Sequence, residues 1–479
     1  MHQPDSKIKI HLYEKIATDL SQQIYSGVLV SGDKIPSVRE TCQQYQVSMS
    51  TVLQAYYQLE SKSLIRSVPQ SGYYVSHRLQ TSGLPNKSNP SIHLSNEDTS
   101  DIVSKVYDGI SSDHMMLSLG VPSAKLLPLS KLNKALNHAL HSLPEYGSAY
   151  EHVLGNPKLR RQIARLSATW GGQLTEDDIL TTAGCSGAMT QAIIALTQRG
   201  DTIAVESPVY FGILQLALSL GLKVLELPTH PETGIELEAL KAAFVKNKIK
   251  LCLFISNFSN PMGGTMSVEH KKELVRLLEY YHIPLIENDM YGDLYFGPAR
   301  PTNCKTYDES GLVLLCSSIS KTLAPGYRVG WLTPGIFTEQ IRRVKFATTI
   351  SSATITQEAV ADFLEKGRYE SHLKKLRNTL QSNCLNYTEA VRTWFPEGTK
   401  ISRPQGGFML WVELDPKINT AALYNQTIKR KVSFAPGRMF TLQNQFNNCL
   451  RLSYGLPWTE QVKTAIKTIG TLAKYQETY

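Results

Sequence analysis

The spacing of hydrophobic residues separates a short helical region at the start of the chain from a much longer region of alternating elements. Up to about residue 78, apolar positions recur every three or four residues, which predicts a helix that ends at Gly27, a second helix over 36–45 and a third helix after Ser48. The apolar face of the third helix consists of Val52, Ala55, Tyr56 and Leu59. Residues 64–68 and 73–75 flank a Pro-Gln-Ser-Gly turn and predict a hairpin. Three helices and a hairpin outline a winged helix-turn-helix, although helical spacing alone equally allows a dimerisation or docking domain.

From about residue 105 onward, short apolar runs alternate with helical stretches. The runs have the length and the Val, Ile and Leu content of buried strands, at 203–205, 224–227, 251–255, 283–286 and 312–315. This alternation predicts an α/β domain with a mainly parallel sheet covered by helices, and functional residues at the carboxyl ends of the strands. Residues 79–104 lack apolar periodicity and are rich in Ser, Asn and Pro, so we expect a flexible linker. The predicted organisation is a small domain over 1–78, the linker, and the α/β domain over 105–479.

The composition is that of a globular protein and narrows the class of partner. The chain has 479 residues, 42% of them apolar, which favours two or three domains. The net charge of +9 is only a weak sign of a polyanionic partner, because many enzymes are mildly basic. Residues 1–78 carry eight basic and six acidic side chains, a net charge of +2, so the small domain is not a strong polycation. The seven cysteines show neither paired spacing nor CxxC, so we expect reduced thiols and no metal site. With no long apolar run and no signal-peptide segment, we expect a soluble cytoplasmic protein without a membrane anchor.

One lysine stands out because of the residues around it. Lys321 ends the segment Cys-Ser-Ser-Ile-Ser-Lys, directly after the apolar run 312–315, and Arg328 follows seven residues later. A lysine at a strand end among hydroxyls, with an arginine nearby, suits a Schiff base to an aldehyde cofactor that carries a phosphate. This pattern indicates pyridoxal phosphate, although Lys321 taken alone also fits an ordinary surface lysine.

Four separated blocks of the first region resemble the GntR family of DNA-binding domains in order and spacing. The blocks are 27–40, 47–52, 55–56 and 71–75. The resemblance implies that the partner is double-stranded DNA, that Arg39 contacts its backbone or a base, and that Gly72 lets the wing approach the minor groove. It also implies that the start of the recognition helix, which would enter the major groove, is formed by Ser48, Ser50 and Thr51. This chain has Met49 where the family usually has arginine, so a DNA contact is lost and we expect binding to depend on dimerisation.

The second region resembles the fold-type I aminotransferases over about 115–475. The Gly-Cys-Ser turn before a helix, the Asn-Pro-x-Gly turn and the lysine segment occur in that family's order. The resemblance implies that Lys321 carries pyridoxal phosphate, that Tyr210 stacks on the cofactor ring, and that Asn260 and Tyr291 donate to its phenolic oxygen. It implies that the phosphate is bound by Arg328, Ser318, Ser320, Gly184, Cys185 and Ser186. For Tyr210, a place in the hydrophobic core is the alternative.

Two further matches imply a second subunit and a ligand. Tyr150 resembles the tyrosine that reaches the phosphate from the neighbouring subunit, which implies a homodimer. Arg451 lies in a segment that closes the substrate pocket, where its two-pronged guanidinium would hold the α-carboxylate of an amine or amino-acid effector, unless it is an exposed arginine in a salt bridge. A GntR module followed by an aminotransferase-like domain resembles the MocR branch of the GntR regulators.

One departure from the aminotransferase pattern bears on catalysis. The family has an aspartate that pairs with the pyridine nitrogen, and this chain has Asn288 at that position. An amide cannot supply the charge that keeps the nitrogen protonated, so the ring would be a poorer electron sink. Asp289 could replace it only if the strand slipped by one residue, because neighbouring side chains point to opposite faces.

Three hypotheses follow. The first is a DNA-binding transcriptional regulator whose aminotransferase-like domain holds pyridoxal phosphate and senses a small amine, an amino acid or the cofactor itself. The second is a working aminotransferase with an appended DNA module, and the third is an enzyme with a helical docking module. The four GntR blocks favour the first hypothesis over the third, and Asn288 favours it over the second because it disfavours turnover.

Overall fold

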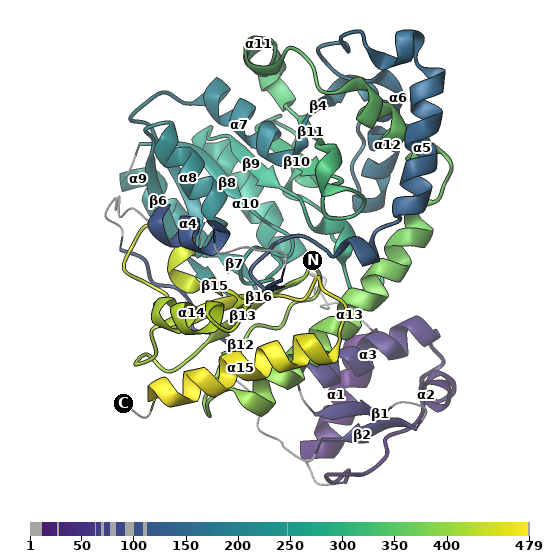
Figure 1. The fold of residues 1–479 in the computed structure, drawn as a ribbon, viewed down its shortest axis with the longest axis vertical. Helices are drawn as coiled ribbons and strands as arrows, with labels where there is room; N and C mark the ends of the chain where they lie inside the picture. Colours follow the sequence, from purple (N-terminus) through teal and green to yellow (C-terminus); the bar gives the residue numbers. More distant parts are fainter. Residues whose placement is uncertain are drawn as a thin grey trace, which may run out of the picture. The chain divides into compact units, whose positions relative to one another are not determined.

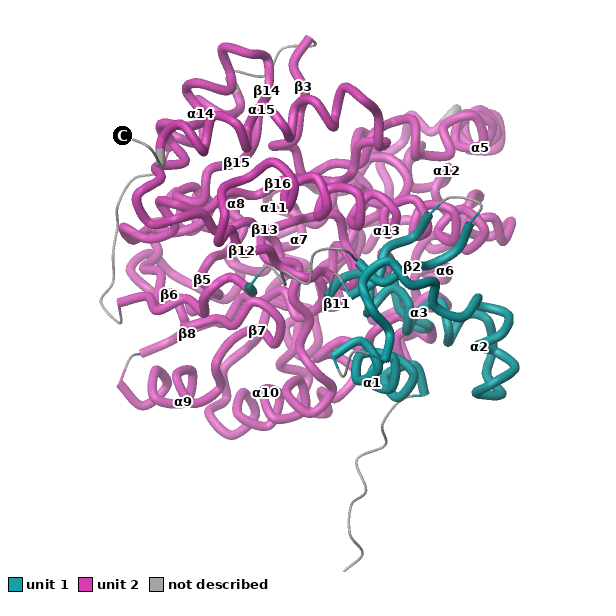
Figure 2. The backbone as a smooth tube through the Cα atoms, turned by 90° about the horizontal axis from the view of Figure 1, so that it is seen from below, with its two compact units in different colours: residues 1–83, 296–299 teal, residues 84–295, 300–479 magenta. Residues whose placement is uncertain are grey.

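Two units make up the chain in the computed structural model, one over residues 1–83 with 296–299 and one over residues 84–295 with 300–479 (Figure 2). The structure describes residues 12–25, 28–62, 64–68, 71–76, 83–91, 100–108, 113–246 and 248–477. Among these, no helix is long and apolar enough to cross a membrane.

The first unit contains the predicted three helices and hairpin. These elements are α1 (Leu12–Tyr25), α2 (Val38–Tyr45), α3 (Met49–Ser61), β1 (Ile65–Val68) and β2 (Gly72–Val75), with the two strands antiparallel. Their apolar faces meet in one core, which includes every residue that the third helix was predicted to bury. The core consists of Ile16, Ala17, Leu20, Ile24, Ile35, Val52, Ala55, Tyr56, Leu59, Leu64, Ile65 and Val75.

Side-chain caps set where two of these helices begin. Helix α2 begins at Val38, two residues later than predicted, because the side chains of Ser37 and Glu40 each bond to the other's backbone N–H in a capping box. Ser48 caps α3 as predicted, since its side-chain oxygen accepts from the backbone N–H of Thr51. The predicted helix end at Gly27 and the turn residues 69–70 lie outside the described residues.

The second unit is built on an eight-stranded sheet that is mainly parallel, as predicted (Figure 1). The strand order is β4-β11-β10-β9-β8-β5-β6-β7. All five predicted strands form its parallel part, as β5 (Thr202–Ser207), β6 (Lys223–His230), β8 (Ile249–Phe254), β9 (Leu285–Asn288) and β10 (Val313–Ser318). The apolar runs did not predict three other strands of the sheet, β4 (Leu180–Ala183), β7 (Gly234–Ile235) and β11 (Val329–Thr333). Strands β7 and β11 run antiparallel to their neighbours β6 and β10, and β4, which pairs antiparallel with β11, runs in the same direction as β10.

Successive residues of the sheet face two different cores. On β8, Leu251 and Leu253 pack with helices α7, α8 and α11, whereas Cys252 and Phe254 pack with α9 and α10. This alternation buries both faces of the sheet and accounts for the continuous apolar runs in the sequence. The helices of the unit are α4 (Ser100–Asp108), α5 (Leu129–Ser142), α6 (Pro157–Ser167), α7 (Gly184–Leu196), α8 (Phe211–Ser219), α9 (Leu237–Lys246), α10 (Val268–Tyr281), α11 (Thr338–Thr349), α12 (Thr354–Glu365), α13 (Tyr369–Trp394), α14 (Thr420–Ile428) and α15 (Glu460–Glu477).

A smaller antiparallel sheet completes the second unit. Its strand order is β12-β13-β16-β15, and a separate short pair joins β3 (Met115–Met116) to β14 (Val432–Ser433). The strands of the sheet are β12 (Lys400–Ile401), β13 (Met409–Glu413), β15 (Ala435–Pro436) and β16 (Cys449–Ser453). Strand β16 carries Arg451, one of the predicted site residues.

Part of the segment predicted as a linker is bonded to the second unit. The backbone N–H and the side-chain amide of Asn86 both donate to Glu413 at 2.6 Å, and the Ser88 hydroxyl accepts from the backbone N–H of Thr229 at 2.8 Å. Helix α4 begins at residue 100, inside the predicted linker. Residues 79–82 and 92–99 lie outside the described residues, and the linker boundaries stay a prediction.

Candidate functional site

Three of the predicted DNA-contacting side chains lie together at the start of α3. The Ser48 hydroxyl lies 2.7 Å from that of Ser50 and 2.9 Å from that of Thr51. Met49, between them, is 57% exposed, and Ser48 and Ser50 are exposed as well. A helix start with exposed hydroxyls and free backbone N–H groups is suited to contact phosphates and base edges.

The other two predicted DNA contacts lie on α2 and at the hairpin. Arg39 is exposed in the first turn of α2. Gly72 begins β2 with φ +106°, a conformation that favours glycine, and a Cβ there would lie 3.3 Å from Cε of Lys34. Lys34 was not predicted as a site residue, although it lies in the 27–40 block. Its bridge to Tyr74 places it against the hairpin, where an exposed cation is suited to meet a phosphate.

Lys321 lies beyond the end of β10, among cationic groups. Its Nζ donates to the backbone oxygen of Gly120, a contact between residues two hundred positions apart that the sequence did not suggest. Burial lowers the pKa of Lys321 to about 8, and the guanidinium groups of Arg451 and Arg328 act in the same direction, while Cys185 opposes them. A lysine with a lowered pKa is more often neutral and is therefore the better nucleophile.

Arg328 lies at the start of α7 because two glycines leave room for it. Its Nη2 donates to the backbone oxygen of Ala183 at 3.1 Å, and a Cβ on Gly184 would lie 2.5 Å from the same nitrogen. A Cβ on Gly330 would meet the backbone of Gly184 at 2.4 Å, so β11 and the start of α7 approach each other directly. The exposed guanidinium and the free N–H groups of the helix together form an anion site.

Hydroxyl groups line the same region, and as hydrogen-bond donors they suit a phosphate group. The Ser318 hydroxyl accepts from the backbone N–H of Ser320 at 3.3 Å. The Ser320 hydroxyl is buried and has no hydrogen-bond partner among the described residues, so it is available to a ligand oxygen. Ser186 is exposed in the first turn of α7, next to Cys185. The donors are those that a phosphate requires.

Asn288 and Asp289 point to different partners. The Asn288 side-chain oxygen accepts from the Cys185 thiol, with sulfur and oxygen 3.4 Å apart, at the start of α7. The Asp289 carboxylate pairs with Arg300 and accepts from the side chain of Asn303 at 3.2 Å. Asn288 pairs with Cys316 of β10 in the sheet register. Its side chain lies on the side of the sheet where Cys185 is, whereas the charge of the Asp289 side chain is balanced by Arg300.

Arg451 is a buried cation with an incomplete set of partners. It is 1% exposed; Nη1 donates to the Asn260 side-chain oxygen at 2.9 Å, and Nη2 donates to the backbone oxygen of Ser118. Its Nε has no partner, and within the described part of the chain no carboxylate pairs with it. Burial accordingly lowers the pKa of Arg451. An unpaired buried guanidinium is costly and would be stabilised by a ligand carboxylate.

Three of the remaining predicted site residues lie near Arg451 or interact with it, and one lies apart from this site. Asn260 donates from its amide to the Tyr291 hydroxyl at 3.3 Å, so the two predicted donors to the phenolic oxygen lie together. Tyr210 is half-buried, and its electrostatic interactions with Arg451, Cys185 and Arg328 place it at this site. Tyr150 is 84% exposed and is not part of the cluster within one chain.

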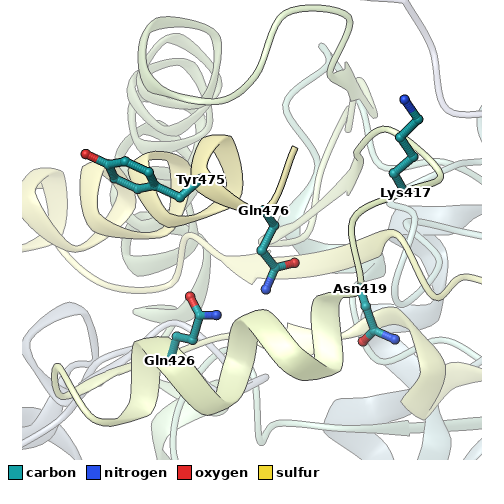
Figure 3. A pocket seen from close by; sticks show the side chains of 5 residues that line it. All are labelled: Lys417, Asn419, Gln426, Tyr475 and Gln476. Atoms are coloured by element: carbon teal, nitrogen blue, oxygen red, sulfur yellow. The ribbon is translucent and has the colours of Figure 1, made fainter. Parts of the chain in front are cut away.

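Two other features lie apart from this cluster. A hollow of about 410 Å³ at the ends of α14 and α15 is lined by Lys417, Asn419, Gln426, Tyr475 and Gln476, none of them a predicted site residue (Figure 3). None of the seven cysteines, all of which lie in described parts of the chain, forms a disulfide. Within the described residues, no group of three or more His, Cys, Asp or Glu side chains could hold a metal ion.

Comparison with known proteins matches both units. Residues 12–75 match the family described as bacterial regulatory proteins, gntR family, and residues 113–469 match aminotransferase class I and II. The HTH-type transcriptional regulator YjiR of Escherichia coli (strain K12) is 36% identical over 96% of this chain and 98% of its own length. This chain belongs to the MocR branch of the GntR regulators. YdcR, another HTH-type transcriptional regulator of that strain, is 33% identical over 96% of this MocR-type chain and 98% of its own length.

Solved structures match the aminotransferase-like unit. A kynurenine aminotransferase of Pyrococcus horikoshii, in complex with PMP, has a TM-score of 0.74 at 26% identity and covers 79% of this chain and 95% of its own. A multiple substrate aminotransferase of Thermococcus profundus shares the fold with a TM-score of 0.73 at 23% identity, covering 78% of this chain and 95% of its own. The predicted fold class, family and cofactor class are confirmed: this MocR-type chain joins a GntR DNA-binding domain to a fold that depends on pyridoxal phosphate.

Proposed function

We propose that this MocR-type regulator controls transcription through DNA binding that depends on pyridoxal phosphate held at Lys321 and on a small amine or amino acid bound beside it. The observation that carries the proposal is the position of Asn288, which lies beside Cys185 without a carboxylate charge while Asp289 is paired with Arg300. A site with a reactive lysine and no carboxylate for the ring nitrogen is suited to binding an amine more than to turning it over.

The cofactor would be held by residues from several strands and turns of the second unit. Its phosphate would be bound by Arg328, Ser318, Ser320 and the turn from Gly184 to Ser186. Tyr210 would lie against the ring, Asn260 and Tyr291 would donate to the phenolic oxygen, and Asn288 would face the ring nitrogen. When bound, pyridoxal phosphate supplies an aldehyde that reacts reversibly with amines and a ring that accepts electrons.

The chain's own side chains determine what that site can do. Lys321, with its pKa near 8, is deprotonated in about a tenth of molecules at pH 7, so its amine can attack and be displaced. Arg451 would take the carboxylate of an amino-acid effector, which would supply the partner that the buried guanidinium lacks. A ligand that pairs with Arg451 shifts the equilibrium toward whichever conformer binds it better.

We further propose a homodimer in which Tyr150 reaches the phosphate of the partner subunit. Its high exposure in a single chain supports this role, because a tyrosine that leaves most of its ring in water has no packing role there. Two DNA modules on one dimer would compensate for Met49, which stands where a charged contact is usual. Arg39, Ser48, Ser50, Thr51 and Gly72 would form each DNA-contacting surface.

The decisive experiment is to recover genomic fragments bound by the full-length protein and sequence them, with and without pyridoxal phosphate. The proposal expects an enriched sequence made of two half-sites, whose enrichment changes when the cofactor is removed. The Lys321→Ala variant should bind the same sequence in the manner of the cofactor-free protein. If enrichment were identical in all three samples, the link between cofactor and DNA would be refuted.

The same protein distinguishes the alternative, a working aminotransferase with an appended DNA module. The aminotransferase neighbours and the presence of Lys321 and Arg451 favour that alternative. Incubation with common amino acids and a keto acid would reveal turnover at about 1 per second or faster if the chain were an ordinary enzyme. The proposal expects amino-acid binding without turnover at that rate.

A further inference from the structure

A buried series of polar contacts joins the residue that follows Asn288 to the residue that follows Lys321. Asp289 pairs with Arg300, and Nε of Arg300 donates to Asp293 at 2.6 Å. The Tyr369 hydroxyl lies 2.7 Å from the second Asp293 oxygen and 3.0 Å from the Thr322 hydroxyl. Arg300 and Tyr369 are both almost fully buried, whereas the Asp293 side chain between them is 27% exposed, so water is largely excluded from Arg300 and Tyr369 and reaches part of Asp293.

The protons in this series can be assigned from chemistry. A carboxylate only accepts, so the single proton of Tyr369 belongs to its bond with Asp293. The Thr322 hydroxyl has one proton, which it can donate to the Tyr369 oxygen at 3.0 Å or to the backbone oxygen of Ile319 at 3.4 Å, and the shorter distance favours Tyr369. Burial and the neighbouring Asp293 raise the pKa of Tyr369, which keeps the phenol protonated. Tyr369 is therefore the link between an ion-paired carboxylate and the hydroxyl next to Lys321.

A second residue of helix α13, which begins at Tyr369, contacts the backbone of Thr322. Nε2 of His372, one turn along α13, lies 2.7 Å from the backbone oxygen of Thr322. Since that oxygen only accepts, Nε2 carries the proton, and burial lowers the pKa of His372 and so favours the neutral ring. The first turn of α13 thus holds Thr322 by its side chain and by its main chain.

We propose that Tyr369 is a positioning residue that holds the turn carrying Lys321 in place for the cofactor. The inference rests on the proposed function, in which Lys321 carries pyridoxal phosphate. The lysine amine is connected to the backbone only through a flexible four-carbon stem, so its position depends on how firmly the turn is held. Tyr369 holds that turn through Thr322 and is itself held by Asp293.

The test compares two tyrosines of the same helix. Tyr369→Phe removes a hydroxyl with two partners, whereas Tyr387→Phe removes a buried hydroxyl that has no hydrogen-bond partner within the described residues. In full-length protein, Tyr369→Phe should weaken retention of pyridoxal phosphate by about tenfold, since a hydrogen bond to a charged group is lost. It should also shift the pH midpoint of the visible absorbance of the bound cofactor. Tyr387→Phe should leave both quantities unchanged.

A double-mutant cycle shows whether Tyr369 acts through Thr322. Thr322→Val removes the hydroxyl while keeping the shape, and it should weaken retention in the same direction. The combined variant should lose less than the product of the two single losses, because both remove one contact. Equal behaviour of Tyr369→Phe and Tyr387→Phe, or full additivity in the cycle, would overturn the inference. If wild-type protein formed no cofactor adduct at Lys321, the proposed function would fail, and the inference with it.

Discussion

The start of α3, here called the tip, and the site around Lys321 differ in how far apart along the chain their residues lie. At the tip, Ser48, Ser50 and Thr51 are near neighbours in the sequence and bond to one another within 2.9 Å. Around Lys321, the interacting groups lie far away along the chain: its Nζ donates to the backbone oxygen of Gly120, and the charge of Arg451 acts on its pKa. The tip is exposed and its geometry follows from one helix cap, whereas the lysine site is largely buried and requires the whole sheet.

This contrast predicts how far the effect of a substitution should spread in each region. A change at the tip alters what the tip contacts and, at Ser48, the cap of its own helix, because these side chains are not among the buried core residues. A change at the lysine site alters charges that act on one another through a medium of low polarity, so one substitution is felt by several residues. The following predictions test that separation, beginning with the largest expected effect.

Lys321→Ala should abolish the covalent cofactor adduct completely, because it removes the amine that lies beyond the end of β10 near Arg328 and Arg451. Mass spectrometry of the full-length protein after borohydride reduction measures the adduct. Lys125→Ala, which changes an exposed lysine, should leave the adduct intact. An adduct that persists in the Lys321 variant would show that another residue carries the cofactor.

Arg39→Ala should weaken specific DNA binding by about tenfold to a hundredfold, the range for one lost base contact, while leaving cofactor absorbance unchanged. Binding isotherms at fixed salt on the enriched operator give the ratio. Lys15→Ala removes the same charge from an exposed position on α1 and provides the matched control. A parallel loss of cofactor binding in the Arg39 variant would contradict the separation of the two regions.

Asn288→Asp should speed the conversion of bound cofactor to its amine form by an amino acid, by about tenfold or more, because a carboxylate would favour the protonated ring nitrogen. Single-turnover absorbance measures the rate. Asp289→Asn should bring no such gain and should lower the free energy of unfolding by about 3 kcal/mol, because it leaves Arg300 without one of its partners. Equal rates in Asn288→Asp and wild type would refute the role given to Asn288.

Capture of pyridoxal phosphate by the cofactor-free protein should depend on pH through Lys321. Its pKa is lowered to about 8, so the neutral fraction rises about tenfold per pH unit below 8 and levels off above it. Stopped-flow absorbance between about pH 6 and pH 9 would give this profile. A rate that kept rising up to the ordinary lysine pKa would mean that burial does not lower it.

Ser48→Ala should have the smallest effect, a loss of about 1 kcal/mol in the free energy of unfolding of the first unit, because one helix cap is removed. Thermal unfolding measures this loss. Ser21→Ala changes a hydroxyl inside α1 that only bonds back to Ala17, and it should cost less. Cofactor absorbance should remain that of wild type in both variants.

Much of the fold could be predicted because its signals are local. The five parallel strands were apolar runs long enough to be buried on both faces, and Ser48 carries its capping role in its own side chain. The strands β4 and β11 escaped prediction because they are short and include polar and glycine residues such as Thr181 and Gly330. Helix α2 began later than predicted because a capping box outweighed the proline preference.

The sequence by itself was enough to predict the fold class, which is confirmed, and to propose a division into domains and the candidate site residues, including Lys321, Arg328 and the asparagine at position 288. Helical and strand periodicity and motif spacing involve residues that are close together in the sequence, so the sequence alone reveals them. Only the tertiary structure decided that Asp289 pairs with Arg300, that Arg451 is buried without a carboxylate, and that Tyr369 holds the turn of Lys321. Such contacts join distant residues, and they depend on sheet register and side-chain packing, which no local pattern encodes.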